Sequence, residues 1–165
     1  MHFSVCGLAD GFVLFTWFEL VELSCKNEYA LLALIELASH YTSGEPLQIR
    51  QISAQQNIPD RYLEQLLATL RRGGLVRSQR GAKGGYILAR EPWNINLLEV
   101  MLCLEGSDAQ PNDSEPLTKT VESAVIWDLW NETTVAAHAV LREHTLQDLC
   151  EKRDARRQLD IMYYI

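Results

Sequence analysis

The sequence has few cysteines, a shortage of positive charge and no apolar run long enough to span a bilayer. Its four cysteines, Cys6, Cys25, Cys103 and Cys150, include no Cys-x-x-Cys pair. So few cysteines in a chain of this length argue against a secreted disulfide scaffold. The apolar stretch 12–18 is too short for a membrane span and follows no basic segment, so it is a poor signal peptide. We expect a cytoplasmic protein with free thiols and no membrane partner.

Catalytic motifs are missing as well. The chain contains no nucleophile elbow, no P-loop and no dinucleotide-binding glycine motif. We therefore do not expect an enzyme.

The 165 residues contain no internal repeat, and 47% of them are apolar, which suits one globular domain with an appended dimerisation element. The pattern from Glu22 onward looks like a protein start, so we interpret residues 1–20 as an upstream extension from a misassigned start.

The net charge of −7 conceals a strong asymmetry. Residues 47–90 contain eight basic residues and two acidic ones, so this segment carries +6 and the rest of the chain −13. A basic segment on an otherwise acidic protein indicates one surface that faces an anion, although basic patches are also common on solvated faces. The eight basic residues are Arg50, Arg61, Arg71, Arg72, Arg77, Arg80, Lys83 and Arg90.

The spacing of apolar residues predicts a mainly α-helical protein with one small β-hairpin. We expect helices over residues 28–41, 47–56, 60–72, 96–105, 119–142 and 146–153, and strands over 75–78 and 86–89. The first helix is apolar on nearly every side, which predicts burial all round. Asn57 suits a tight turn, and Pro59 suits the first turn of the following helix.

A buried helix, a short helix, a tight turn, an amphipathic helix and a hairpin, in this order, predict a winged helix-turn-helix. The second helix of the pair would enter the major groove of DNA. On its outer face, Arg61 and Gln65 can donate hydrogen bonds to bases or phosphates, and Glu64 can accept one from a cytosine amino group. The hairpin tip would place Arg80 and Lys83 next to phosphates, among glycines that allow a close approach: Gly81, Gly84 and Gly85.

The helix predicted over residues 119–142 is about 36 Å long, which is more than a compact small domain needs. Its apolar stripe predicts a contact with a second copy of the chain, and Trp127 is expected in the same dimer core. The stripe consists of Ile126, Trp130, Thr133, Ala137, Val140 and Leu141. We divide the chain into the extension 1–20, a DNA-binding domain 21–105, an acidic loop 106–118, and a dimerisation helix with a C-terminal tail, 119–165.

The run YLEQLLATLRRGGLVRSQRGAKGGYILAR resembles the signature of bacterial winged helix-turn-helix regulators of the Rrf type, the relatives of IscR, NsrR and CymR. The opening ELSCKNEYALLAL is also similar. The resemblance implies a homodimeric transcription regulator, not an enzyme, that binds a palindromic operator in double-stranded DNA. It places the base-reading glutamate at Glu64, and the tyrosine two residues earlier is Tyr62. The wing motif falls on Arg80, Gly81, Gly84, Gly85 and Tyr86.

The chain departs from the iron–sulfur members of this family. Those members carry three closely spaced cysteines before the long helix, whereas residues 106–125 contain none. Some members carry no cluster and respond through a partner protein, and others use an acidic ligand near the N-terminus, at the position of Glu28. Cys103, Cys25 and Glu28 are thus candidate ligands of a 2Fe–2S cluster, with His138 and His144 as further candidates. The alternative is that Cys103 packs as a small apolar side chain.

A second class of function is also compatible with this fold. The chain could be a dimeric scaffold or co-regulator that acts through protein contacts without binding DNA. The basic segment and the complete wing motif favour DNA binding.

Overall fold

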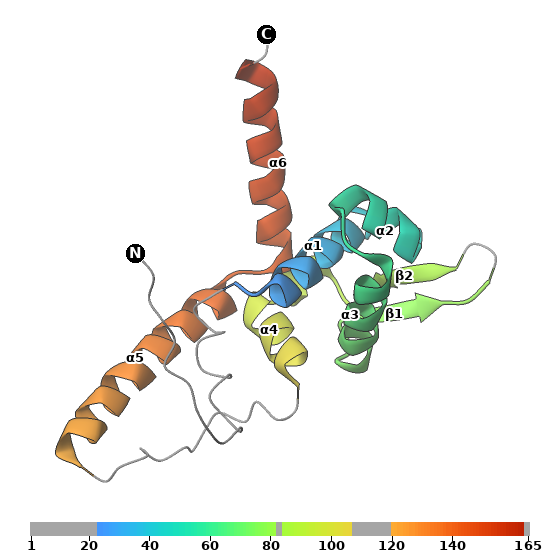
Figure 1. Cartoon of the computed structure of the whole chain (residues 1–165). Helices are drawn as coiled ribbons and strands as arrows, with labels where there is room; N and C mark the ends of the chain where they lie inside the picture. The colour runs from blue at the N-terminus through green and yellow to red at the C-terminus, as the bar shows by residue number, and fades with distance from the viewer. Residues whose placement is uncertain (1–22, 82–83, 107–119, 164–165) are drawn as a thin grey trace, which may run out of the picture.

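A computed structural model describes residues 23–81, 84–106 and 120–163 (Figure 1). It confirms a mostly helical chain with one antiparallel hairpin. The elements are α1 (Cys25–Ser39), α2 (Ile49–Gln56), α3 (Asp60–Arg72), β1 (Val76–Gln79), β2 (Gly85–Leu88), the 3-10 turn η1 (Pro92–Asn94), α4 (Leu97–Glu105), α5 (Val121–Glu143) and α6 (Leu146–Tyr163). The extension 1–20, Lys83 and nearly all of the acidic loop lie outside the described residues. Within the described ranges, no helix is long and apolar enough to cross a membrane.

Helix α1 lies at the centre of the core and packs against α2, α3, α4 and α6 (Figure 1). It begins three residues earlier than predicted, because the Ser24 side chain accepts a hydrogen bond from the Asn27 N–H at 3.2 Å and caps the helix. The prediction that α1 is buried all round is wrong. Within the predicted range, Glu28 and Ser39 are exposed. Three apolar residues there are only half-buried: Leu31, Leu32 and Ile35.

The turn between α2 and α3 is the one that the sequence predicts. Asn57 adopts the left-handed conformation with φ 53°, and Ser53 Oγ donates to the Ile58 carbonyl at 2.7 Å. Pro59 is the cap residue immediately before α3, and α3 has the predicted bounds 60–72. Four leucines on one face of α3 are then buried: Leu63, Leu66, Leu67 and Leu70.

The hairpin β1–β2 is joined to the helices by a third segment. Val76 pairs with Leu88 and Gln79 with Gly85, and Leu47 pairs with Tyr86 just before α2. The Leu47 N–H donates to the Tyr86 carbonyl at 3.0 Å, and the Tyr86 N–H donates to the Leu47 carbonyl at 2.8 Å. The strands differ by one residue at each end from the predicted ranges. The hairpin is therefore held against the helix pair through backbone hydrogen bonds.

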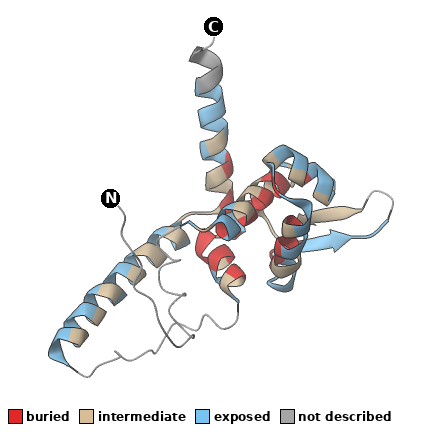
Figure 2. Ribbon diagram, viewed as in Figure 1, coloured by how far each residue is buried: buried red, intermediate tan, exposed pale blue. Residues whose placement is uncertain are grey.

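Helix α5 runs away from the core, and none of its residues is buried in the described part of the chain (Figure 2). The residues of the predicted apolar stripe differ in how far they are exposed. Ile126 and Val140 are exposed, whereas Trp130, Ala137 and Leu141 are half-buried. The exposed large apolar residues of α5 are Val121, Val125, Ile126, Leu129, Val135 and Val140.

Helix α6 is much longer than the predicted 146–153. Its start is anchored, because Leu146 is fully buried and the Leu146 N–H donates to the Ile95 carbonyl at 2.9 Å. Apolar periodicity ends near Arg153, which misled the prediction. Most of the residues that follow have high helix propensity, so the helix continues into solvent: Ala155, Arg156, Arg157, Gln158, Leu159 and Met162.

Candidate nucleic-acid interface

The outer face of α3 presents a set of polar side chains to solvent. Arg61, Glu64 and Gln65 are all exposed on the first two turns, opposite the four buried leucines. This separation orients α3 firmly, because rotating the helix would expose the leucines. The three side chains together offer donors and an acceptor to a groove of DNA.

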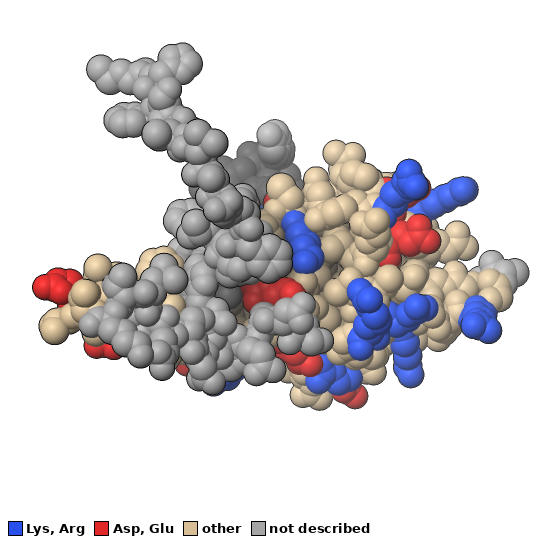
Figure 3. Space-filling model, turned by 60° about the horizontal axis from the view of Figure 1, so that its bottom comes forward, with Lys and Arg blue, Asp and Glu red and all other residues tan. Residues whose placement is uncertain are grey.

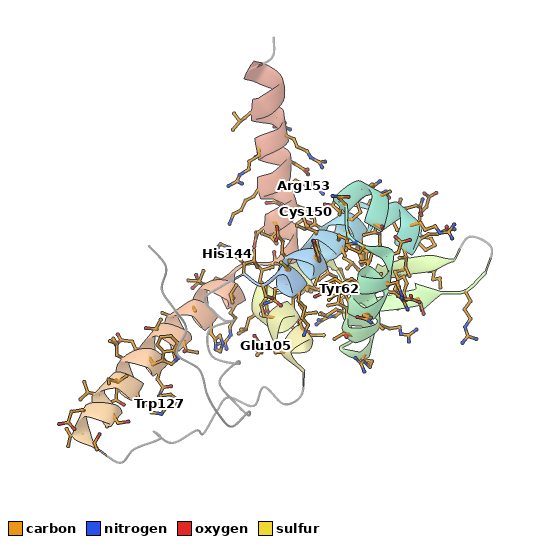
Figure 4. The ribbon with its side chains drawn as sticks, in the orientation of Figure 1. Tyr62, Glu105, Trp127, His144, Cys150 and Arg153 are labelled. Atoms are coloured by element: carbon orange, nitrogen blue, oxygen red, sulfur yellow. The ribbon has the colours of Figure 1, made fainter. Side chains whose placement is uncertain are left out.

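Tyr62 does not belong to that outer face. It is half-buried, and its ring lies edge-on to Tyr29 of α1, with centroids 5.8 Å apart and an interplanar angle of 76° (Figure 4). Such an edge-to-face pair contributes about 1 kcal/mol beyond area burial. The ring of Tyr62 thus helps to position α3 on α1.

The glycines of the hairpin are needed for the backbone conformation and backbone packing of the hairpin itself. The Gly84 N–H donates to the Gly81 carbonyl at 2.9 Å, and Gly81 has φ +119°, a conformation that L side chains rarely adopt. A Cβ on Gly85 would overlap the Leu47 carbonyl, and one on Gly84 would crowd the Gln79 carbonyl. The sequence motif therefore marks tight backbone packing as well as access for DNA. The close approach of Leu47, which pairs with Tyr86, requires glycine at position 85. Nothing in the local sequence indicates this pairing.

Basic side chains gather around α3 and the hairpin (Figure 3). Arg61, Arg71, Arg72, Arg77 and Arg80 are all exposed. Arg71 Nη1 donates to Ser78 Oγ at 3.4 Å, which links the end of α3 to β1. Arg90 is an exception, because it forms an ion pair with Glu99 of α4 and supports the fold. The surface is therefore positive where α3 and the hairpin meet, as an anionic partner requires.

The thiol of Cys103 lies at the inner end of this surface. It is half-buried, and its Sγ donates to the Thr69 carbonyl at 3.7 Å. Desolvation raises the pKa of the Cys103 thiol, and the carboxylate of Glu99 raises it further. These surroundings favour the neutral thiol.

Other candidate ligands of a cluster are not assembled around Cys103. Cys25 and Glu28 are exposed on the first turn of α1. That turn is near α4, because Lys26 Nζ donates to the Leu104 carbonyl at 2.6 Å. Within the described ranges, however, no three His, Cys, Asp or Glu side chains come together as a metal site. A 2Fe–2S cluster therefore does not fit Cys103, Cys25 and Glu28 of one chain.

The two histidines are separate from one another. His144 ends α5 at its junction with α6 (Figure 4). His138 is half-buried within α5, and its Nε2 has no hydrogen-bond partner among the described residues. Neither histidine joins a metal-binding group in the part of the chain that the structure covers.

The Cys103 side chain fills the space that is left by the missing Cβ of Gly73. A Cβ on Gly73 would overlap Cys103 Sγ. We expect Gly73→Ala to lower the free energy of unfolding by about 1–3 kcal/mol, as overpacking usually does. Urea denaturation measures this change. In a Cys103→Ala background the same substitution should cost much less, and an equal cost in both backgrounds would contradict the contact.

Known proteins resemble this chain in sequence and in structure. The model of the Rrf2 family, described as an iron-dependent transcriptional regulator, matches residues 23–152. The HTH-type transcriptional regulator CymR of Bacillus subtilis (strain 168) is 35% identical over 148 residues, which cover 88% of this chain and 100% of CymR. A putative HTH-type transcriptional regulator of Synechocystis, slr0846, is 37% identical over 132 residues, covering 78% of this chain and 87% of the relative.

Solved structures give the same result. IscR of T. potens superposes with a TM-score of 0.66 at 36% identity, covering 80% of this chain and 88% of IscR. The structure of CymR, named as the global cysteine regulator of B. subtilis, superposes with a TM-score of 0.65 at 35% identity and covers 79% of this chain and 97% of CymR. The winged-helix arrangement predicted from the sequence is thus confirmed, and these relatives are named as regulators.

Proposed function

Because the chain belongs to the Rrf2 family of DNA-binding, non-enzymatic transcriptional regulators, we propose that it binds a palindromic operator as a homodimer. The proposal assigns base recognition to α3 and phosphate contacts to the hairpin. The observation that carries it is the exposed set Arg61, Glu64 and Gln65 on α3, next to the exposed Arg80 of the hairpin. Nothing in the described structure favours a scaffold that does not bind DNA. Such a regulator acts in the cytoplasm, where its DNA is.

We assign residues 21–105 to DNA binding and 119–165 to dimerisation. Within the first unit, Arg61 and Gln65 are suited to donate to base edges or phosphates, and Glu64 is suited to accept from a cytosine amino group. Gly81, Gly84 and Gly85 shape the turn that carries Arg80 and Lys83. Tyr62 and Tyr86 support α3 and the hairpin from the inside.

The homodimer is supported by α5. Four exposed apolar side chains recur along one side of it: Val121, Val125, Leu129 and Val140. Soluble proteins rarely leave such a stripe in contact with water. A second copy related by two-fold symmetry would cover it with the same stripe. Two DNA-binding units in one dimer would then meet half-sites about one helical turn of DNA apart.

We expect two distinct effects from three variants in the DNA-binding unit. Arg80→Ala should weaken binding to all DNA sequences and reduce the slope of log affinity against log salt by about one. Lys83→Ala is expected to act in the same way. Glu64→Ala should instead relax the base preference at one position of each half-site. Fluorescence anisotropy with a footprinted operator and its single-base variants measures both effects.

Arg156→Ala is the matched control for Arg80→Ala. It also removes one exposed positive charge, but from α6, away from the hairpin. The control should leave the salt slope unchanged. Equal slopes for all of these variants, together with an unchanged base preference of Glu64→Ala, would show that α3 and the hairpin do not meet DNA.

Regulation by iron is a second, more specific candidate function, because the matching family model is described as iron-dependent. A 2Fe–2S cluster would need ligands from both chains of the dimer, with Cys103 first and Cys25 and Glu28 next. Anaerobic reconstitution with iron and sulfide, followed by visible absorption, tests this candidate. A colourless, iron-free protein whose DNA affinity is unchanged by Cys103→Ala would eliminate it and leave a small molecule or a partner protein as the effector.

A further inference from the structure

A cavity of about 790 Å³ opens between the last turn of α3, helix α4 and the end of α5. This volume falls within the range of small-molecule sites. On α3 the cavity is lined by Thr69 and Arg72, in the last turn. The residues assigned to base recognition lie in the first two turns, so a ligand in the cavity would lie beside the DNA-reading residues and not on them. Cys103 lies in its wall, next to Gly73.

Two guanidinium groups line this cavity from opposite elements. Arg72 is the last residue of α3, and Arg142 is the second-last residue of α5. Arg72 Nη2 donates to Thr69 Oγ1 at 3.1 Å, which leaves its other N–H groups available to a ligand. Arg142 forms no ion pair with any described residue.

The acidic residue in the wall is paired with a basic residue outside the cavity. Glu99 forms an ion pair with Arg90, which does not line the cavity. The remaining walls are polar or apolar but uncharged, with Asn96 on one side and Leu98 and Leu102 on another. Leu102 is 41% exposed, although it is a large apolar side chain. The net charge that a ligand meets is therefore positive, with an apolar wall beside it.

We propose that this cavity is a regulatory site for a small organic anion, held by its carboxylate or phosphate group between Arg72 and Arg142. Guanidinium groups bind both kinds of anion through paired, charge-assisted hydrogen bonds. The regulatory part rests on the proposed function. A ligand that joins Arg72 to Arg142 couples the recognition helix to the dimerisation helix, and so changes how the two recognition helices are spaced on an operator.

The rates at which the Cys103 thiol is alkylated by a charged and by a neutral reagent report the charge of the cavity in the full-length protein. Its thiolate displaces iodide from iodoacetate, an anion, and from iodoacetamide, its neutral analogue of nearly equal size. The ratio of the two alkylation rates at one thiol is independent of the fraction of thiolate. Mass spectrometry gives this ratio separately for Cys103 and for the exposed Cys25.

We expect the ratio of iodoacetate to iodoacetamide rates at Cys103 to fall by about threefold to tenfold in Arg72→Gln and in Arg142→Gln, the size expected for one charge near a partly exposed site. The ratio at Cys25 should not change in these variants. Arg156→Gln, the control on α6, should change neither ratio. Added salt should lower the ratio at Cys103. A ratio at Cys103 that is unaffected by both cavity variants would overturn the anion site.

The alkylated proteins then test regulation. Carboxymethyl-Cys103 places a carboxylate in the cavity, and carbamidomethyl-Cys103 places a neutral amide of similar size there. In a Cys6→Ser/Cys25→Ser background, we expect the operator affinities of the two adducts to differ by about threefold or more. Equal affinities would overturn the regulatory role. The alkylation ratios require no DNA, so a failure of the proposed DNA binding is distinguishable from a failure of the anion site.

Discussion

Changing Leu129 to glutamate should dissociate the homodimer and remove operator binding. Leu129 is 65% exposed at the middle of the stripe formed by Val121, Val125, Leu129 and Val140 on α5. In a two-fold interface the substitution occurs twice, so two apolar contacts are lost and two carboxylates are brought close together. Burial of one leucine contributes about 1.5–3 kcal/mol, so the dimer should weaken by about a hundredfold or more.

Analytical ultracentrifugation at micromolar concentration measures the dissociation directly, and anisotropy measures operator affinity. The matched control is Leu159→Glu on α6, where an exposed leucine lies outside the stripe. The control should remain dimeric. A stable dimer of the Leu129→Glu variant would place the interface on another surface, and a monomeric wild-type protein would exclude the homodimer altogether.

The second large effect is expected at Gly85, where the hairpin meets the segment before α2. A Cβ there would overlap the Leu47 carbonyl and crowd the Gln48 N–H. Gly85→Ala must therefore separate β2 from Leu47 and break the two hydrogen bonds between Leu47 and Tyr86. We expect a loss of about 2–4 kcal/mol in the free energy of unfolding, which lowers the melting temperature by about 5–15 °C.

Binding to DNA should weaken as well in Gly85→Ala, because the hairpin would no longer hold Arg80 in place. Gln79→Ala is the control, since Gln79 pairs with Gly85 across the hairpin and is exposed. Calorimetry should give the control a melting temperature close to that of the wild type. A Gly85→Ala protein of wild-type stability would contradict the close approach of β2 to Leu47.

Much of the helix-turn-helix could be predicted from the sequence. The spacing of Leu63, Leu66, Leu67 and Leu70 depends only on the period of an α-helix, so the buried and exposed faces of α3 follow from it. The left-handed turn at Asn57 is also a local property. The same reasoning failed for α6, because a helix that continues through the propensity of its residues alone has no apolar period.

By itself, the sequence determined the order of the elements, the outward direction of Arg61, Glu64 and Gln65, and the positive charge of the central segment. Only the tertiary structure decided which distant residues meet. It placed Tyr62 against Tyr29, Gly85 against Leu47, and Cys103 against Gly73. Local periodicity specifies which face of a helix is buried, but the neighbour on that face depends on how whole elements pack. The cavity between Arg72 and Arg142 arises in the same way, from two helices that are far apart in the chain.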